Sequence, residues 1–206
     1  MWSYSTSGIN SGATLMQLLN GVYLTRGSIN YYNNSTTATT VNFNSTGLTD
    51  VAQSLMNTGK GNNKLSRYYL GGFLSSDQNV NVIYSAERGR TSRSESASYW
   101  DGTIGLMYAS DYGYAAGNDC VMNTDLKAYD DSCKSKDWLY IPSSQQWTIS
   151  SYSSDDKQVK IIFPFGNGTG DYASYKNGVA SPVFYLKSSV SITSGTGTQD
   201  DPYLVS

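Results

Sequence analysis

Two segments indicate the fold best: Asn177-Gly-Val-Ala-Ser-Pro-Val-Phe-Tyr-Leu-Lys187 and Gly105-Leu-Met-Tyr-Ala-Ser-Asp-Tyr-Gly-Tyr-Ala-Ala116. The first is an apolar strand entered through a Gly and a Pro, and the second is a strand that runs into a short helix capped by Ser110. Residues 117–176 between them are rich in Ser, Tyr, Asn, Asp and Gly. This layout predicts a rigid scaffold that displays a polar, aromatic surface, which favours binding over catalysis.

The composition bounds the size and the partners of the protein. Its 206 residues are enough for one large domain or two small ones, since domains commonly contain about 100 to 200 residues. Charged residues make up 15% and the net charge is −2, so the basic surface that nucleic-acid binding requires is absent. The chain has 18 Tyr and 20 Gly, a composition typical of binding loops. The alternative is that these tyrosines are ordinary strand residues of a β-rich secreted domain.

The chain contains no His, and this restricts its chemistry. Histidine is the commonest general base and the commonest transition-metal ligand. Its absence rules out serine triads, the usual zinc sites and Cys–His nucleophiles. Catalysis would have to use carboxylates, Lys or Tyr, and we therefore predict a non-catalytic protein without a cofactor or a metal.

The two cysteines, Cys120 and Cys133, enclose an acidic loop. Their spacing excludes a CxxC redox site. In an oxidising compartment they would form a disulfide, which the loop-entropy model values at about 3 kcal/mol. A reduced pair in a cytosolic protein is the alternative.

No apolar run approaches the roughly 18 residues that span a bilayer, and residues 1–10 lack the pattern of a secretory signal. We interpret Met1 as the start that remains after a leader or membrane anchor has been removed. The expected location is extracellular, at a cell surface, with contact to the membrane only through such an anchor.

Hydrophobic periodicity and turn residues predict the order of the elements. A composition shift near residues 65–75 suggests an N-terminal layer of helix and strands at 1–66, packed against a module at 67–206. Helices are expected at 11–20, with Gly21 as the stop, at 49–57 after a Thr49 or Asp50 cap, and at 110–116. Strands are expected at 21–25, 28–32, 68–73, 80–84, 102–108, 138–141, 146–149 and 157–165, and 183–186 is predicted to be the last long core strand.

A resemblance to a known family rests on residues 100–116, the two cysteines, residues 137–140 and 146–149, and the segment 178–187. Together these motifs resemble the C-type-lectin-like domains, of the formylglycine-generating-enzyme type, in surface proteins of low-GC Gram-positive bacteria. Diversity-generating retroelements also vary this scaffold, and related proteins often carry a pilin-type anchor. The resemblance covers roughly residues 65–206. It implies an α+β, C-type-lectin-like fold with short, mainly antiparallel strands and a few short helices.

The chain departs from this family at positions that matter for activity. Ala180 and Ser181 stand where the closing Gly-Val-Arg-Pro pattern has its Arg. The paired catalytic cysteines of the enzyme have no counterpart near the C-terminus, so its copper-dependent oxidase activity is not carried over. The Glu-Pro-Asn and Trp-Asn-Asp signatures of calcium-dependent lectins are also missing, so the sequence does not support sugar binding through calcium.

Two polar segments, residues 150–157 and 166–177, are predicted to form the recognition surface. Tyrosine side chains suit contact anchors, and Ser, Asp and Asn side chains supply directional hydrogen bonds. These residue types are also what adenine-directed mutagenesis tends to produce. Ordinary solvated hairpin loops are the alternative. The candidate ligand-binding residues are Trp147, Tyr152, Ser153, Asp155, Asp156, Asn167, Asp171, Tyr172, Tyr175 and Asn177.

Three other groups are noted, two of which have two interpretations each. Phe163-Pro-Phe165 is either core or an exposed apolar wedge. Glu87 and Arg88 belong to a charged segment whose ion pairs would cross a surface loop and contribute little. The acids around the cysteines form either a solvated face or an oxygen-rich calcium loop, although they lack EF-hand spacing. These acids are Asp119, Asp125, Asp130 and Asp131.

The resulting hypothesis is an extracellular, surface-displayed, adhesin-like module that recognises a protein or a glycan through these loops. The alternative is a pilin-like structural subunit whose N-terminal helix and sheet assemble a filament. The sequence leaves the ligand unidentified.

Overall fold

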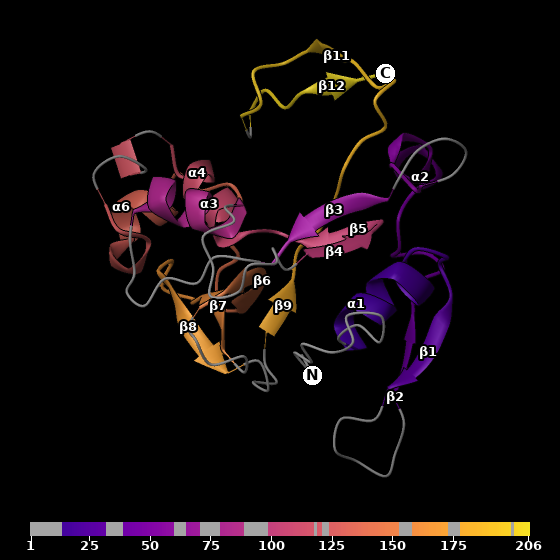
Figure 1. The fold of residues 1–206 in the computed structure, drawn as a ribbon, viewed down its shortest axis with the longest axis horizontal. Coiled ribbons are helices and arrows are strands. Elements are labelled where there is room, and N and C mark those ends of the chain that lie inside the picture. Colours follow the sequence, from indigo (N-terminus) through magenta and orange to yellow (C-terminus); the bar gives the residue numbers. More distant parts are fainter. Residues whose placement is uncertain are drawn as a thin grey trace.

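The computed structural model describes residues 14–31, 39–59, 65–70, 79–88, 99–117, 119–120, 124–152, 158–172, 178–198 and 200–206. These residues form a mixed α+β structure of short, mainly antiparallel sheets and a few short helices, as the sequence predicts (Figure 1). The helices are α1 (Thr14–Leu18), the π-helix η2 (Leu19–Tyr23), α2 (Asp50–Leu55), α3 (Val80–Arg88), α4 (Ala109–Ala115), the 3-10 helix η3 (Leu126–Ala128) and α6 (Asp131–Lys134).

The strands fall into one four-stranded sheet and four pairs. The large sheet has the order β8-β7-β6-β9, with β6 and β9 parallel and the other neighbours antiparallel. The pairs are β1–β2, β3–β4, β5–β10 and β11–β12. The strand bounds are β1 (Ser28–Tyr31), β2 (Thr39–Asn42), β3 (Ser66–Tyr69), β4 (Tyr99–Gly102), β5 (Ile104–Leu106), β6 (Gln145–Ser151), β7 (Gln158–Ile162), β8 (Gly168–Tyr172), β9 (Gly178–Ala180), β10 (Pro182–Phe184), β11 (Ile192–Ser194) and β12 (Leu204–Val205).

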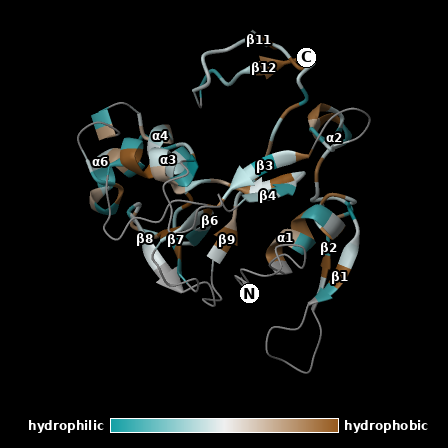
Figure 2. Cartoon of the chain, in the orientation of Figure 1, coloured by the Kyte–Doolittle hydropathy of each residue, from teal (hydrophilic) through white to brown (hydrophobic). Residues whose placement is uncertain are grey.

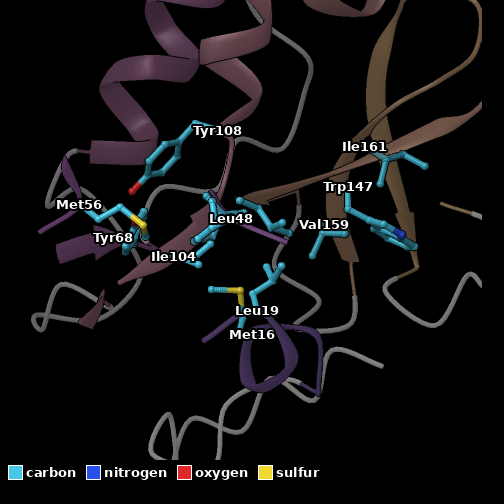
Figure 3. Packing of buried hydrophobic residues seen from close by; sticks show 12 residues of the cluster. Met16, Leu19, Leu48, Met56, Tyr68, Ile104, Tyr108, Trp147, Val159 and Ile161 are labelled. Carbon is cyan, nitrogen blue, oxygen red and sulfur yellow. The ribbon is translucent and has the colours of Figure 1, made fainter. Parts of the chain in front are cut away.

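The first hydrophobic cluster joins the N-terminal elements to the rest of the chain. Met16 and Leu19, from the first helices, pack with Ile104 of β5 and Trp147 of β6 (Figure 3). The Asn20 side chain fixes this contact, because its Oδ1 accepts hydrogen bonds from the N–H groups of residues 103 and 104, at 3.1 and 2.9 Å, and its amide donates to the Ile104 carbonyl at 2.8 Å. Residues from both sides of the predicted boundary at 66 therefore share one core, and the boundary itself stays a prediction.

The second cluster lies under helices α3 and α4 and contains the cysteines. Cys120 and Cys133 form a disulfide, with a sequence separation of 13. Brown, apolar residues in Figure 2 occur on the helices and strands that supply both clusters. The second cluster consists of Val80, Ile83, Met107, Ala109, Tyr112, Ala116, Cys120, Leu126, Tyr129, Cys133 and Ile162.

Several predicted elements are confirmed. Helix α2 begins after Thr49, whose hydroxyl accepts a hydrogen bond from the Ala52 N–H at 3.1 Å, as an N-cap does. Strands β1, β5, β6 and β7 lie within or across the predicted strand segments at 28–32, 102–108, 146–149 and 157–165. Strand β3 shares only Tyr68 and Tyr69 with the segment predicted at 68–73, of which residues 71–73 lie outside the described residues.

The predicted strand at 80–84 is wrong, because these residues begin helix α3. Val80 and Ile83 are buried while Val82 and Tyr84 are exposed, which is the spacing of a helix and not of a strand. Asn79 supplies the start signal, since its side-chain Oδ1 accepts from the Val82 N–H at 3.2 Å. The run Val-Asn-Val-Ile-Tyr is so short that its apolar residues fit both the spacing of a helix and the alternation of a strand.

Two further predicted strands are replaced by other local structure. Residues 21–25 continue the first helix through η2, so Gly21 is not its stop; the chain instead turns at Arg26, which has a positive φ of 56°. Residues 138–141 form a turn, in which the Asp137 carboxylate accepts the Leu139 N–H at 2.9 Å. Because the Asp137 side chain accepts this backbone N–H, the N–H does not need a carbonyl of a neighbouring strand.

Helix α4 is also capped differently from the prediction. Tyr108 occupies the cap position, and its N–H donates to the Asp111 carboxylate at 2.9 Å. Ser110 lies inside the helix and is buried. Near the C-terminus, β10 ends at Phe184 and is only half-buried, so residues 183–186 are not a long core strand.

In the Phe163-Pro-Phe165 segment, one phenylalanine packs on the core and the other is exposed. Phe163 is half-buried and packs on the first cluster, whereas Phe165 is 73% exposed. The acidic residues near the disulfide are largely solvated, since the side chains of Asp119 and Asp131 are 91% and 90% exposed.

Asp137 gives the fold a testable pH dependence. It is 6% exposed, its Oδ2 has no hydrogen-bond partner among the described residues, and burial raises its pKa from 3.8 to about 7. Because the folded-state pKa is the higher one, its contribution to stability is full below about pH 4 and is lost as the pH rises through about 7. We expect Asp137→Asn, which cannot ionise, to be more stable than the wild type by up to about 4 kcal/mol at about pH 8 and nearly equal to it at about pH 4.

Urea unfolding of both proteins at the two pH values measures this difference. Groups that titrate elsewhere cancel in the comparison, because both proteins contain them. Equal pH slopes for wild type and variant would show that the Asp137 carboxyl does not titrate in a buried site.

Candidate binding cleft

Three of the predicted recognition residues, Trp147, Tyr152 and Asn167, differ in their burial and in their contacts. Trp147 is 7% exposed, and its indole packs on the backbone of Gly178, where an added Cβ would come within 2.1 Å of Nε1. Tyr152 is half-buried, with its ring over Gly170 and the Lys160 Nζ 4.8 Å from the ring centroid. Asn167 is half-buried, and its backbone carbonyl accepts the Phe163 N–H at 2.9 Å.

Two further predicted residues lie at the end of an edge strand of the large sheet. Asp171 and Tyr172 end β8, paired in register with Val159 and Gln158 of β7. Ser153, Asp155, Asp156, Tyr175 and Asn177 lie outside the described residues. Trp147 packs in the first hydrophobic cluster. The assignment of these residues to ligand binding stays a prediction.

A different part of the chain forms a cleft of about 500 Å³. It lies between β3 and the segment that follows β10. Backbone hydrogen bonds hold that segment in place: the Asn57 N–H donates to the Tyr185 carbonyl at 2.8 Å, and the Lys187 N–H donates to the Leu55 carbonyl at 2.9 Å. The lining residues are Asn57, Ser66, Arg67, Tyr69, Tyr185, Leu186 and Ser188.

The β3–β4 pair supplies one wall of the cleft through its alternation. Ser66 and Tyr68 face the core, and Arg67 and Tyr69 therefore face outward. Their cross-strand partners are Asp101 and Tyr99. Sequence alternation within Ser-Arg-Tyr-Tyr is the signal that could have located this wall, together with the facing Tyr-Trp-Asp-Gly of residues 99–102.

Arg67 is held rigidly on this wall. Its Nε and a terminal nitrogen donate to the two carboxylate oxygens of Asp101 at 2.9 and 3.0 Å, and its guanidinium lies 3.6 Å from the Tyr99 ring centroid. The hydrogen bonds to Asp101 raise the pKa of Arg67 further, so the pair keeps opposite charges side by side. Such a planar, two-bond arrangement fixes donors and acceptors in one orientation.

Tyr185 forms the opposite wall. It is 46% exposed, its ring centroid lies 5.3 Å from that of the buried Tyr68, and burial raises its pKa. Tyr68 is itself fixed, because its hydroxyl lies within hydrogen-bonding distance, 3.2 Å, of the carbonyl oxygens of both Thr103 and Val183. The Tyr108 hydroxyl donates to the Tyr69 carbonyl at 3.0 Å and ties the first wall to helix α4.

A second guanidinium continues the same surface beyond the cleft. Arg88 lies between the rings of Tyr84 and Tyr108, at 4.2 and 4.1 Å from their centroids, and pairs with the Asp111 carboxylate at 2.9 Å. Tyr84 makes an edge contact with Tyr114 at 5.7 Å. We call the exposed tyrosines of this region the tyrosine surface; they are Tyr69, Tyr84, Tyr99, Tyr114 and Tyr185.

Glu87 is a buried residue of α3 whose hydrogen bonds hold together the elements that carry this surface. It is 2% exposed and accepts hydrogen bonds from the N–H and hydroxyl of Ser110, from the Ser150 hydroxyl, and from Arg88 at 3.2 Å. Burial raises its pKa. Glu87 thus connects α3, α4 and β6, and the expectation that it makes a weak ion pair in a surface loop is wrong.

The arrangement is suited to binding. Asp101 and Asp111 each pair with an arginine, and no group of three His, Cys, Asp or Glu side chains within the described part of the chain could hold a metal ion. The groups that the cleft offers are aromatic faces, guanidinium donors, an amide and hydroxyls. These groups recognise a ligand by stacking and hydrogen bonding.

Comparison of the chain with protein-family models, curated proteins and solved structures finds no match. None of the helices in the described ranges is long and apolar enough to cross a membrane. Any functional assignment therefore rests on the residues of the cleft and of the tyrosine surface.

Proposed function

We propose that this chain is an extracellular, non-catalytic ligand-binding module that recognises a protein or a glycan. The observation that carries the proposal is the cleft between Tyr69 and Tyr185. Its volume of about 500 Å³ falls in the range of small-molecule sites, about 300 to 1,000 Å³. Rigid aromatic side chains with few rotatable bonds provide contact area at low entropic cost.

The extracellular location is supported by the Cys120–Cys133 disulfide, because such bonds persist in oxidising compartments. The finer fold assignment, a C-type-lectin-like domain, is supported by the α+β class and by the sequence motifs alone. The polar loops at 150–157 and 166–177 remain candidates for a second contact region. An experimental structure of the whole chain would test both assignments.

Amide chemical shifts of the isotope-labelled protein test the binding role for ligands of different chemistry. Two libraries are added at millimolar concentration, one of oligosaccharides and one of proline-rich and aromatic peptides. We expect at least one compound to shift amides of residues 57, 66–69 and 185–188 selectively. If both libraries leave these amides unchanged, the proposal fails.

Variants of the cleft provide the second test. We expect Tyr69→Ala and Tyr185→Ala to weaken binding about tenfold each, since each removes an aromatic contact face. Tyr203→Ala is the matched control, because Tyr203 is 54% exposed on the C-terminal hairpin and does not line the cleft. An equal loss of affinity in Tyr203→Ala would contradict the assignment.

The alternative role, a pilin-like structural subunit, is favoured by the β11–β12 hairpin. All three residues of β11 are exposed, as are Tyr203 and Leu204, and Figure 1 shows this pair at one end of the molecule. Exposed edge strands can pair with another chain. Sedimentation velocity over a wide concentration range distinguishes the roles, because a subunit would form larger species and a binding module would stay monomeric.

A further inference from the structure

We propose that the ligand of the cleft is a neutral oligosaccharide whose sugar rings stack on Tyr69 and Tyr185. This inference rests on the proposed binding function and narrows its ligand class. The other ligand classes that the cleft could accept are charged glycans and peptides. The charges of the site argue against charged glycans, and peptide binding is one of the outcomes that the test distinguishes.

The aromatic walls match the apolar faces of sugar rings. A pyranose ring presents a face of C–H groups, and these groups are attracted to the negative face of a tyrosine ring. Tyr69 and Tyr185 line the cleft and are 36% and 46% exposed, so each ring keeps accessible area while its base is held by the fold. Both rings line the same cleft, so a flat, amphipathic sugar ring that enters it can stack on either of them.

The charges of the site favour a neutral ligand. Arg67 is neutralised by Asp101, and Arg88 is neutralised by Asp111. The other polar lining residues, Asn57, Ser66 and Ser188, are uncharged. An anionic ligand would have to compete with Asp101 for the guanidinium, and a cationic ligand would meet Arg67 in the wall.

Sugar hydroxyls suit the hydrogen-bonding groups of this region. A hydroxyl both donates and accepts, so one hydroxyl can bond the guanidinium and a neighbour can bond the exposed Ser188 hydroxyl, whereas the Asn57 amide donates to the Ser66 hydroxyl at 3.2 Å. The Arg67–Asp101 pair lies beside Tyr99, with its donors and acceptors already in a fixed plane. Little ordering is then required on binding, which favours affinity.

The tyrosine surface extends past the cleft and predicts a ligand longer than one sugar. Tyr99 is the cross-strand partner of Tyr69, and Tyr84 and Tyr114 continue the surface across helices α3 and α4. A monosaccharide could contact the two cleft walls alone. A chain of several sugars could also reach these flanking rings.

The test uses the full chain and defined probes. Cello-, chito-, malto- and manno-oligosaccharides are titrated and followed by amide chemical shifts and calorimetry, beside an oligogalacturonate and a proline-rich peptide. We expect a neutral oligosaccharide to shift the amides of residues 57, 66–69 and 185–188, and to bind at least about tenfold more tightly than its monosaccharide.

Variants identify the stacking contact. We expect Tyr185→Ala to weaken oligosaccharide binding about tenfold, and Tyr185→Phe, which keeps the ring, to retain affinity within about threefold. Unfolding curves check that both variants are folded. If Tyr185→Phe loses as much affinity as Tyr185→Ala in folded protein, the ring is not the stacking surface and the proposal fails.

The remaining outcomes separate this inference from the function on which it rests. If the peptide alone shifts the cleft amides, the ligand is not a glycan, but the binding function stands. If only the oligogalacturonate binds, the argument from charge is wrong. If no probe shifts these amides, both the ligand class and the binding function fall.

Discussion

Replacing Glu87 with Ala is expected to destabilise the protein by about 4 kcal/mol, whereas Glu87→Gln should cost about 1 kcal/mol. The Ala variant leaves the Ser110 N–H and two buried hydroxyls without their acceptor, and it removes one partner of Arg88. It also leaves a cavity beneath helix α4. Gln keeps an acceptor oxygen in place and resembles the protonated acid, which burial favours here.

The same substitution has an effect on pH dependence. Because burial raises the pKa of Glu87 in the folded protein, its contribution to stability is present at low pH and is lost as the pH rises through that pKa. Glu87→Gln removes this loss, so its free energy of unfolding should vary less with pH than that of the wild type.

Urea unfolding of wild type, Glu87→Gln and Glu87→Ala measures both effects. The control is Glu87→Gln at low pH, where the wild-type carboxyl is also neutral and the two proteins should be closest in stability. If Glu87→Ala proves as stable as Glu87→Gln, the carboxylate does not connect α3, α4 and β6.

The sequence predicted those parts of the fold that depend on neighbouring residues. Helix α2 follows from Thr49 and the apolar spacing after it, and β6 and β7 follow from their apolar runs. Helix α3 was missed because the apolar residues of Val80-Asn-Val-Ile-Tyr fit both the spacing of a helix and the alternation of a strand. The role of Ser110 was missed because Glu87, which is distant in the sequence, determines its hydrogen bonds.

The cleft could not be predicted from local patterns. Its walls come from residues near 57, 67 and 185. Contacts between segments distant in the sequence bring them together: the backbone hydrogen bonds between residues 55–57 and 185–187, and the packing of Tyr68 on Tyr185. Tyr185 lies in an apolar run that predicted a buried strand, yet the strand ends at Phe184 and leaves the tyrosine exposed. Long-range pairing decides which of the 18 tyrosines are accessible.

Loss of the Cys120–Cys133 disulfide is expected to destabilise the protein by about 3 kcal/mol. The bond closes a loop with a sequence separation of 13, and it restricts the unfolded chain by an amount that depends on this length. We expect the double variant Cys120→Ala, Cys133→Ala to show this loss in urea unfolding. Alanine is the better replacement, because both sulfurs are buried in the second cluster and serine would bury a hydroxyl.

Reductant supplies the internal control for this prediction. Dithiothreitol should lower the stability of the wild type toward that of the double variant and leave the variant itself unchanged. Binding to the cleft should survive in folded protein, because the cleft lies against the first cluster and the disulfide lies in the second. A wild type that reductant does not destabilise would contradict the prediction and would remove the main support for an extracellular location.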